Sequence, residues 1–184
     1  MQDKKQYMEL IKVKDKEFSL FIDSAKIQEA VAKVAEKINK DLKGKDPLFI
    51  VVLNGAFMFA SDLFKLLTID CTITFVKLSS YSGTDTTGNV KQLIGLTEDI
   101  KGRVVVVVED IVDTGITIEH LLEELNKHEP ADIKIASMLM KPEKFNKGIP
   151  LDYIAMEIPN DFIVGYGLDY DGYARNLPHI YKIV

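Results

Sequence analysis

The chain has 184 residues, of which 47% are hydrophobic and 28% charged, and its formal net charge is −5. This composition predicts one globular domain with a sizeable core and excludes a disordered chain. The acidic balance gives no general attraction to nucleic acid or to membrane surfaces. No apolar run is long enough to span a bilayer, and residues 1–6 are polar. We therefore expect a cytoplasmic protein that binds neither membranes nor nucleic acid.

The first predicted elements are a helix, a strand and a second helix. Asp23 or Ser24 caps the first helix, and its apolar positions recur every three or four residues: Ile27, Val31, Val34, Ile38 and Leu42. A continuous apolar strand follows over residues 48–53, and Asn54-Gly55-Ala56 turns it into a helix over 57–67. Small residues at the carboxyl end of a strand leave backbone donors open to a ligand, or form an ordinary tight turn.

Residues 69–89 change character halfway. Ile69, Cys71, Ile73 and Phe75 alternate with other residues, which predicts a half-buried strand. Residues 79–89 are small and polar, apart from one aromatic residue, Tyr81. A polar loop of this length is either passive or a lid over a ligand, and the residues alone leave both readings open.

Five consecutive valines, residues 104–108, run directly into an acidic turn that is rich in hydroxyl groups. A β-branched run without polar alternation is typical of a parallel strand that is covered on both faces. After the turn, Ile118, Leu121, Leu122 and Leu125 predict a helix. In open α/β sheets, ligands bind outside the carboxyl ends of the strands, so we expect the chemistry at this turn.

The composition of the turn indicates its ligand. Thr114 to Thr117 lie at a helix N-terminus, where unpaired N–H groups favour an anion, and Gly115 permits close approach of the backbone. Glu109 and Asp110 would repel a phosphate unless hydroxyl groups or a cation lay between them. The pattern therefore predicts a phosphorylated sugar and Mg²⁺. Any one of these residues alone would suggest only a helix cap with a solvated acidic turn.

Further strands over residues 133–140 and 153–158 complete an α/β fold with a central, mainly parallel sheet flanked by helices. Lys141 follows the first of these strands, where an isolated lysine is ordinarily a solvated surface residue. Phe162, taken alone, indicates a core position. Arg175 lies four residues past Asp171, a spacing that also fits an ion pair on one face of a helix.

The segment Val107-Val108-Glu109-Asp110-Ile111-Val112-Asp113-Thr114-Gly115-Ile116-Thr117 resembles the phosphoribosyl diphosphate signature of type I phosphoribosyltransferases. From about residue 22 to 180, the chain resembles the hypoxanthine (hypoxanthine-guanine) phosphoribosyltransferases. The resemblance implies a small hood subdomain beside the core. We expect a single domain over residues 1–184, with the core at about 20–158 and the hood from the N-terminal segment and about 159–184.

The resemblance also implies a role for each candidate residue. The ribose and 5-phosphate would be bound by the whole signature turn: Glu109, Asp110, Asp113, Thr114, Gly115, Ile116 and Thr117. Pyrophosphate would contact Asn54, Gly55 and Arg175, with a cis peptide between Asn54 and Gly55. Ser80 and Tyr81 would belong to a flexible lid. Mg²⁺ would be held near Glu109 and Asp110, and a second ion near Asp169.

For the purine, the resemblance implies that Lys141 donates a hydrogen bond to the 6-oxo group, which selects hypoxanthine or guanine over adenine. Phe162 would stack on the base, and Ile163 would present backbone groups to its edge. Asp113 would accept a proton near N7 while N9 attacks the sugar. The products would be the nucleoside 5′-monophosphate and pyrophosphate, and the enzyme would be a homodimer or homotetramer.

Three alternatives remain open at this point. A transferase for xanthine or another nucleobase fits the signature turn equally well, but fits Lys141 and residues 162–165 less well. A regulator that senses phosphoribosyl diphosphate ordinarily needs a surface that binds nucleic acid, which the net charge disfavours. A binding domain without catalysis would leave the acidic pair beside the phosphate cradle unexplained.

Overall fold

The computed structural model describes residues 10–81 and 90–184. Its larger sheet has six strands in the order β5-β4-β3-β6-β7-β8, and only β5 runs antiparallel to its neighbour. These strands are β3 (Leu48–Val52), β4 (Thr72–Tyr81), β5 (Val90–Ile94), β6 (Val104–Val112), β7 (Asp132–Met140) and β8 (Tyr153–Glu157). The five parallel strands form the centre of an α/β fold, as the sequence predicted.

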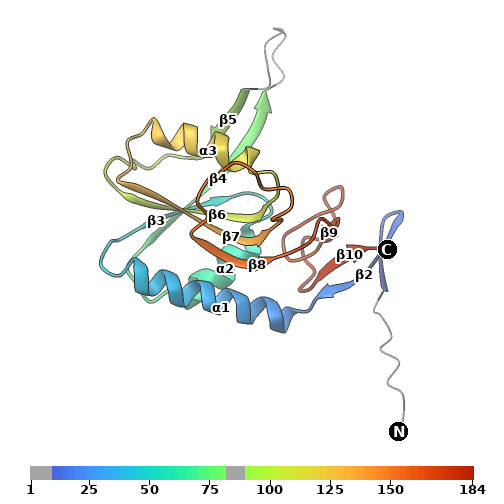
Figure 1. Cartoon of the computed structure of the whole chain (residues 1–184). Helices are drawn as coiled ribbons and strands as arrows, with labels where there is room; N and C mark the ends of the chain where they lie inside the picture. The colour runs from blue at the N-terminus through green and yellow to red at the C-terminus, as the bar shows by residue number, and fades with distance from the viewer. Residues whose placement is uncertain (1–9, 82–89) are drawn as a thin grey trace.

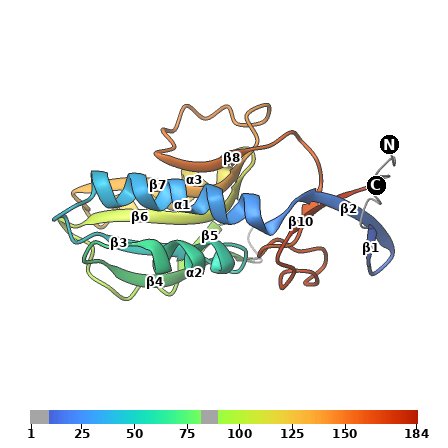
Figure 2. The same cartoon turned by 90° about the horizontal axis from the view of Figure 1, so that it is seen from below.

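Helices cover both faces of this sheet (Figures 1 and 2). α1 (Ser24–Asp41) and α2 (Phe57–Leu66) pack on one face, and α3 (Ile116–Asn126) packs on the other. The valine run in β6 serves both layers, because Val106 and Val108 join the core under α1 and α2, whereas Val105 and Val107 join the core under α3. This two-sided burial explains why the strand has no polar alternation.

A smaller antiparallel sheet forms the hood, in the order β1-β2-β10-β9. Its strands are β1 (Leu10–Val13), β2 (Lys16–Ile22), β9 (Ile163–Val164) and β10 (Ile180–Ile183). Residues from the two ends of the chain thus pair with each other, and the hood lies beside the parallel sheet (Figure 1). The central sheet with flanking helices and a hood confirms the predicted fold class.

Local signals placed most elements correctly. The Asp23 side chain accepts a hydrogen bond from the backbone N–H of Lys26 (3.0 Å), so Asp23 is the N-cap of α1. The predicted apolar positions of that helix are all buried: Ile27, Val31, Val34, Ile38 and Leu42. Gly44 adopts a positive φ of 75° just after the helix, as expected for a residue that helps to end it.

The structure differs from the sequence predictions at three points in residues 53–81. Within residues 72–78 of β4, Thr74 and Val76 are buried, whereas Ile73 and Phe75 are exposed, because neither α1 nor α2 covers this part of the sheet. β4 also continues through Tyr81, so Ser80 and Tyr81 lie in a strand paired with β5. Antiparallel pairing satisfies the backbone there despite the polar sequence. The cis peptide joins Leu53 to Asn54, one residue earlier than expected.

The lid prediction falls mainly on residues 82–89, which lie outside the described residues. None of the helices in the described part of the chain is both long enough and apolar enough to cross a membrane.

Candidate active site

The signature turn lies where β6 ends and α3 begins. Gly115 precedes the helix with φ 84°, a left-handed conformation that a glycine adopts without strain. A cavity of about 230 Å³ opens against the turn and is lined by Glu109, Asp110, Ile111, Val112, Asp113, Thr114, Gly115, Thr117 and Ile118. The turn therefore presents helix N–H groups, threonine hydroxyls and three carboxylates to one space.

A second cavity, of about 280 Å³, shares Glu109, Asp110 and Thr117 with the first. Its other lining residues come from the β3 turn, from β4 and from the hood: Val52, Leu53, Asn54, Gly55, Leu78, Asp169 and Arg175. The fold thus brings the predicted pyrophosphate residues and Asp169 onto the same groove as the acidic pair. The β3 turn and the hood residues are more than a hundred residues apart in the chain, and the acidic pair lies about midway between them.

The acidic pair lies in the groove wall, where Glu109 is buried and Asp110 is half-buried. Burial raises the pKa of Glu109 well above the ordinary carboxyl value, and the neighbouring Asp110 raises it further. Burial also raises the pKa of Asp110 to about 6, although hydrogen bonds from backbone N–H groups and the nearby Arg175 act in the opposite direction. Glu109 Oε2 has no hydrogen-bond partner among the described residues. A buried, unsatisfied oxygen is costly and is ready to receive a donor or a cation.

Arg175 ties the hood loop together at the edge of the groove. Its guanidinium forms an ion pair with Asp169 Oδ1 (2.6 Å) and donates to the carbonyl oxygen of Gly167 (2.7 Å). The predicted alternative, a helical ion pair with Asp171, is wrong, because residues 171–175 form turns and bends and Asp171 instead contacts Lys14. Arg175 is positioned to offer donors to an anion in the groove.

Asp113 faces two lysines from the segment after β7. Lys141 Nζ and Lys144 Nζ each lie 3.4 Å from Asp113 Oδ2, and Lys144 Nζ is also 3.4 Å from Oδ1. Lys141 is not a solvated surface residue, since it is only 7% exposed. The register of the sheet explains this arrangement, because Val112 pairs with Met140 and the next residues leave neighbouring parallel strands together.

The predicted stacking residue, Phe162, belongs to the hood and not to the core. The residue is 45% exposed, and its ring packs against Phe18 and Tyr170, with ring centroids 6.2 and 6.0 Å apart. Ile163 is buried and begins β9. The aromatic cluster therefore holds Phe162 from one side and leaves part of the ring open for a planar ligand.

Some predicted residues do not reach the two cavities with their side chains. Ile116 is exposed at the start of α3 and does not line either cavity. The side chains of Ser80 and Tyr81 lie outside the described part of the structure, and their backbone belongs to β4. Lys144 was missed by the sequence analysis; its one signal was a second basic residue three positions after Lys141.

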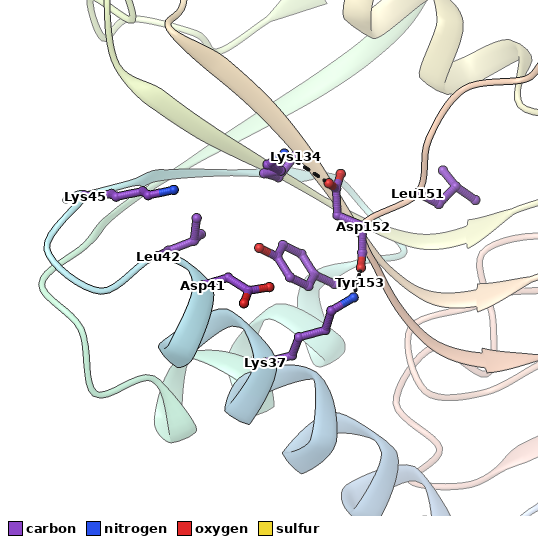
Figure 3. A pocket seen from close by; sticks show the side chains of 8 residues that line it. All are labelled: Lys37, Asp41, Leu42, Lys45, Lys134, Leu151, Asp152 and Tyr153. Carbon is purple, nitrogen blue, oxygen red and sulfur yellow. Dashed lines mark hydrogen bonds and ion pairs between the residues drawn. The ribbon is translucent and has the colours of Figure 1, made fainter.

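A third cavity, of about 510 Å³, lies at the opposite end of the sheet. Figure 3 shows its lining from the last turns of α1 and the starts of β7 and β8. Two of its lysines have partners: Lys37 donates to the carbonyl oxygen of Asp152 (2.6 Å), and Lys134 lies 3.3 Å from an oxygen of the Asp152 carboxylate. It contains none of the predicted site residues.

These features define a phosphoribosyltransferase-type site: an acidic turn before a phosphate cradle, at the carboxyl edge of a parallel sheet. The family described as "Phosphoribosyl transferase domain" matches residues 22–171, and the chain belongs to this family. Among curated proteins, it is 42% identical to the hypoxanthine-guanine phosphoribosyltransferase of Streptococcus pneumoniae R6, covering 88% of this chain and 90% of that protein.

Two further comparisons agree. The chain is 38% identical to the hypoxanthine phosphoribosyltransferase of Escherichia coli K12, covering 90% of this chain and 94% of that protein. Among solved structures, a hypoxanthine phosphoribosyltransferase from Staphylococcus aureus superposes with a TM-score of 0.82 at 32% identity, covering 90% of both chains.

Proposed function

We propose that the chain is a purine salvage enzyme, a hypoxanthine phosphoribosyltransferase that also accepts guanine. It transfers the 5-phosphoribosyl group from phosphoribosyl diphosphate to N9 of the purine and releases pyrophosphate. The observation that carries this proposal is the meeting of three parts at one edge of the sheet: the acidic phosphate cradle, the Asp169–Arg175 pair of the hood, and Lys141 beside Asp113.

The groove has a position for each part of the sugar diphosphate. The 5-phosphate binds at Thr114 to Thr117, where N–H groups and hydroxyls converge at the start of α3. The ribose hydroxyls donate to Glu109 and Asp110, which satisfies the unpaired Glu109 Oε2. Pyrophosphate contacts backbone groups of Asn54 and Gly55 and the guanidinium of Arg175, all of which line the second cavity.

The groove also fits Mg²⁺ as a cofactor. No three acidic, histidine or cysteine side chains of the described residues are clustered into a metal cage. Mg²⁺ ordinarily keeps several waters and binds one or two carboxylates together with substrate phosphates, so a cage is not required. Glu109 and Asp110 would hold the ion at the ribose, and Asp169 would hold a second one at the diphosphate. When bound, the ions neutralise charge on the departing diphosphate.

The purine binds between Lys141 and the hood. Lys141 donates to the 6-oxo group, Phe162 stacks on the ring, and the backbone of Ile163 contacts its edge. N9 forms the new bond to C1 of the ribose as the bond from C1 to the diphosphate breaks, and Asp113 accepts the proton that leaves N7. Lys141 has low exposure, and a buried ammonium group needs hydrogen-bond acceptors. The 6-oxo group of the purine would supply one, which favours this role.

We further propose that core and hood act as one domain, with the core at about residues 20–158, and that the enzyme works in the cytoplasm as a homodimer or homotetramer. The single cysteine provides no internal disulfide, as is usual for a reducing compartment. Ile73 and Phe75 on β4 and Phe57 on α2 expose a large apolar area. A parallel sheet is ordinarily covered on both faces, so a second copy would complete this one.

The test is pyrophosphate release with phosphoribosyl diphosphate and Mg²⁺, with hypoxanthine, guanine, xanthine, adenine and uracil offered separately. We expect turnover with hypoxanthine and guanine, and loss of turnover when a chelator removes Mg²⁺. Turnover with xanthine or uracil alone would still support binding of phosphoribosyl diphosphate at the signature turn. It would contradict the roles proposed for Lys141, Phe162 and Ile163. Binding of phosphoribosyl diphosphate without turnover on any base would place the chain among ligand-sensing regulators.

A further inference from the structure

Lys144 has no role in the assignments above, yet it contacts the proton acceptor. Its Nζ lies 3.4 Å from both oxygens of the Asp113 carboxylate. Lys141 reaches only Oδ2, also at 3.4 Å. Asp113 Oδ1 is a buried oxygen that receives no hydrogen bond from the described residues, because Lys144 is close to it without being aligned as a donor.

The backbone fixes Lys144 in this place. The N–H groups of Lys144 and Phe145 both donate to the carbonyl oxygen of Lys141, each at 3.1 Å, which closes a tight turn directly after β7. Farther along the same segment, Lys147 donates to Glu119 in the first turn of α3 (2.7 Å). The segment is thus held by a tight turn at one end and by an ion pair to α3 at the other, and both restrain the backbone of Lys144.

Lys141 and Lys144 would have different binding partners once substrates are bound. The proposed function requires Lys141 to turn its ammonium toward the 6-oxo group of the purine, which weakens its hold on Asp113. Distances of 3.4 Å are longer than the 2.7–2.9 Å of a tight charge-assisted hydrogen bond, so such a contact can be exchanged. Lys144, whose side chain is 38% exposed, then remains as the cation beside the carboxylate.

We propose that Lys144 is a positioning residue that holds the Asp113 carboxylate in place once Lys141 engages the purine. It donates to Oδ2 and lies equally close to Oδ1, both at 3.4 Å, and therefore restrains the carboxylate as a whole. This inference rests on the proposed function, since it assigns Lys144 to the same reaction.

The experiment is a double-mutant cycle on Lys144 and Asp113. Lys144→Gln should lower kcat about tenfold with hypoxanthine and leave the KM for phosphoribosyl diphosphate within about twofold, because a positioning loss acts on the proton-transfer step. Lys144→Arg should restore most of the rate. Lys127→Gln removes an equal charge from the exposed end of α3 and serves as the control.

The decisive measurement is Lys144→Gln in the Asp113→Asn background, followed by single-turnover kinetics. If Lys144 acts through Asp113, the second substitution should cause no further loss beyond about twofold. If the rate losses caused by Lys144→Gln and Asp113→Asn multiply fully in the double variant, the proposal is overturned. An effect of Lys144→Gln confined to the KM for phosphoribosyl diphosphate would also overturn it. Absence of turnover in the unmodified chain would instead refute the proposed function, so the two failures are distinguishable.

Discussion

Gly55 and Gly167 bring the turn after β3 and the hood loop into direct backbone contact. A β-carbon placed on Gly167 would overlap the carbonyl oxygen of Gly55, and one placed on Gly55 would overlap the Asp110 carboxylate. The hood, the pyrophosphate turn and the acidic pair are therefore stacked with no room for side chains between them. This close approach sets the width of the groove that Asp169 and Arg175 border.

Replacing Gly167 by alanine should open this contact. Both Gly167 (φ 97°) and Gly172 (φ 86°) have positive φ, but a β-carbon on Gly172 would meet no atom within 4 Å. Gly172→Ala should lower the free energy of unfolding only by the cost of placing alanine in a left-handed backbone conformation, roughly 1–2 kcal/mol. Gly167→Ala should lower the free energy of unfolding by at least about 1 kcal/mol more than Gly172→Ala does. It should also raise the KM for phosphoribosyl diphosphate several-fold.

Denaturant unfolding and steady-state kinetics on the two variants, measured side by side, would check this prediction. Equal destabilisation of both variants with unchanged KM values would show that the Gly55 carbonyl imposes no constraint at Gly167.

Lys141→Gln should lower the preference for hypoxanthine over adenine and should change the KM for phosphoribosyl diphosphate much less. Glutamine keeps a donor but loses the charge and also presents an acceptor, so it tolerates the 6-amino group of adenine better than lysine does. We expect the kcat/KM for hypoxanthine to fall about 10- to 100-fold, since a hydrogen bond to a charged group is worth about 1.5–3 kcal/mol.

The measurement is the ratio of kcat/KM for hypoxanthine to that for adenine, with the KM for phosphoribosyl diphosphate as the internal control. An unchanged ratio in Lys141→Gln would remove Lys141 from base recognition.

The strand, turn and helix around the signature could be predicted from the sequence because the signals are local. A β-branched run identifies β6, and apolar positions three and four residues apart identify α3. The pairing of Asp113 with Lys141 and Lys144 could not be predicted from such patterns. It depends on the register that sets Val112 opposite Met140 in neighbouring parallel strands, a relationship between segments about thirty residues apart.

The prediction of which β4 side chains are buried was wrong for a related reason. Alternation reveals that two faces differ, but it does not show which face the rest of the fold covers. Phe75 pairs in register with Val51 and faces the side of α1 and α2, yet these helices do not cover it and it remains 46% exposed. Thr74 on the opposite side is buried instead.

The exposed apolar face of β4 leads to a prediction about assembly. Phe75→Lys should convert the oligomer to monomers, because burying an unpaired ammonium against a second copy is strongly unfavourable. Leu20→Lys changes a similarly exposed apolar residue in the hood and should leave the assembly unchanged. Sedimentation velocity of the three proteins at equal concentration gives the masses. An oligomer that survives Phe75→Lys would exclude this face as the interface.

Asp110→Asn should stabilise the ligand-free enzyme at neutral pH. Burial raises the pKa of Asp110 to about 6 in the folded chain, above the ordinary 3.8 of the unfolded chain, so the folded state binds more protons between these values. The contribution of Asp110 to stability is therefore fully present below about pH 3.8 and is lost as the pH rises to about 6. The loss is on the order of 3 kcal/mol at most. Asparagine carries no such charge and can still accept the hydrogen bond from the Ile111 N–H.

The difference in free energy of unfolding between Asp110→Asn and the unmodified chain should be positive at pH 7.5 and should shrink as the pH falls through about 6 toward 4. Urea titrations at three pH values, without Mg²⁺ or substrate, measure this difference directly. Asp99→Asn, at an exposed loop, controls for the general effect of removing one negative charge. A variant that is less stable than the unmodified chain at every pH would mean that the charged carboxylate is well solvated in the groove and that its burial imposes no penalty.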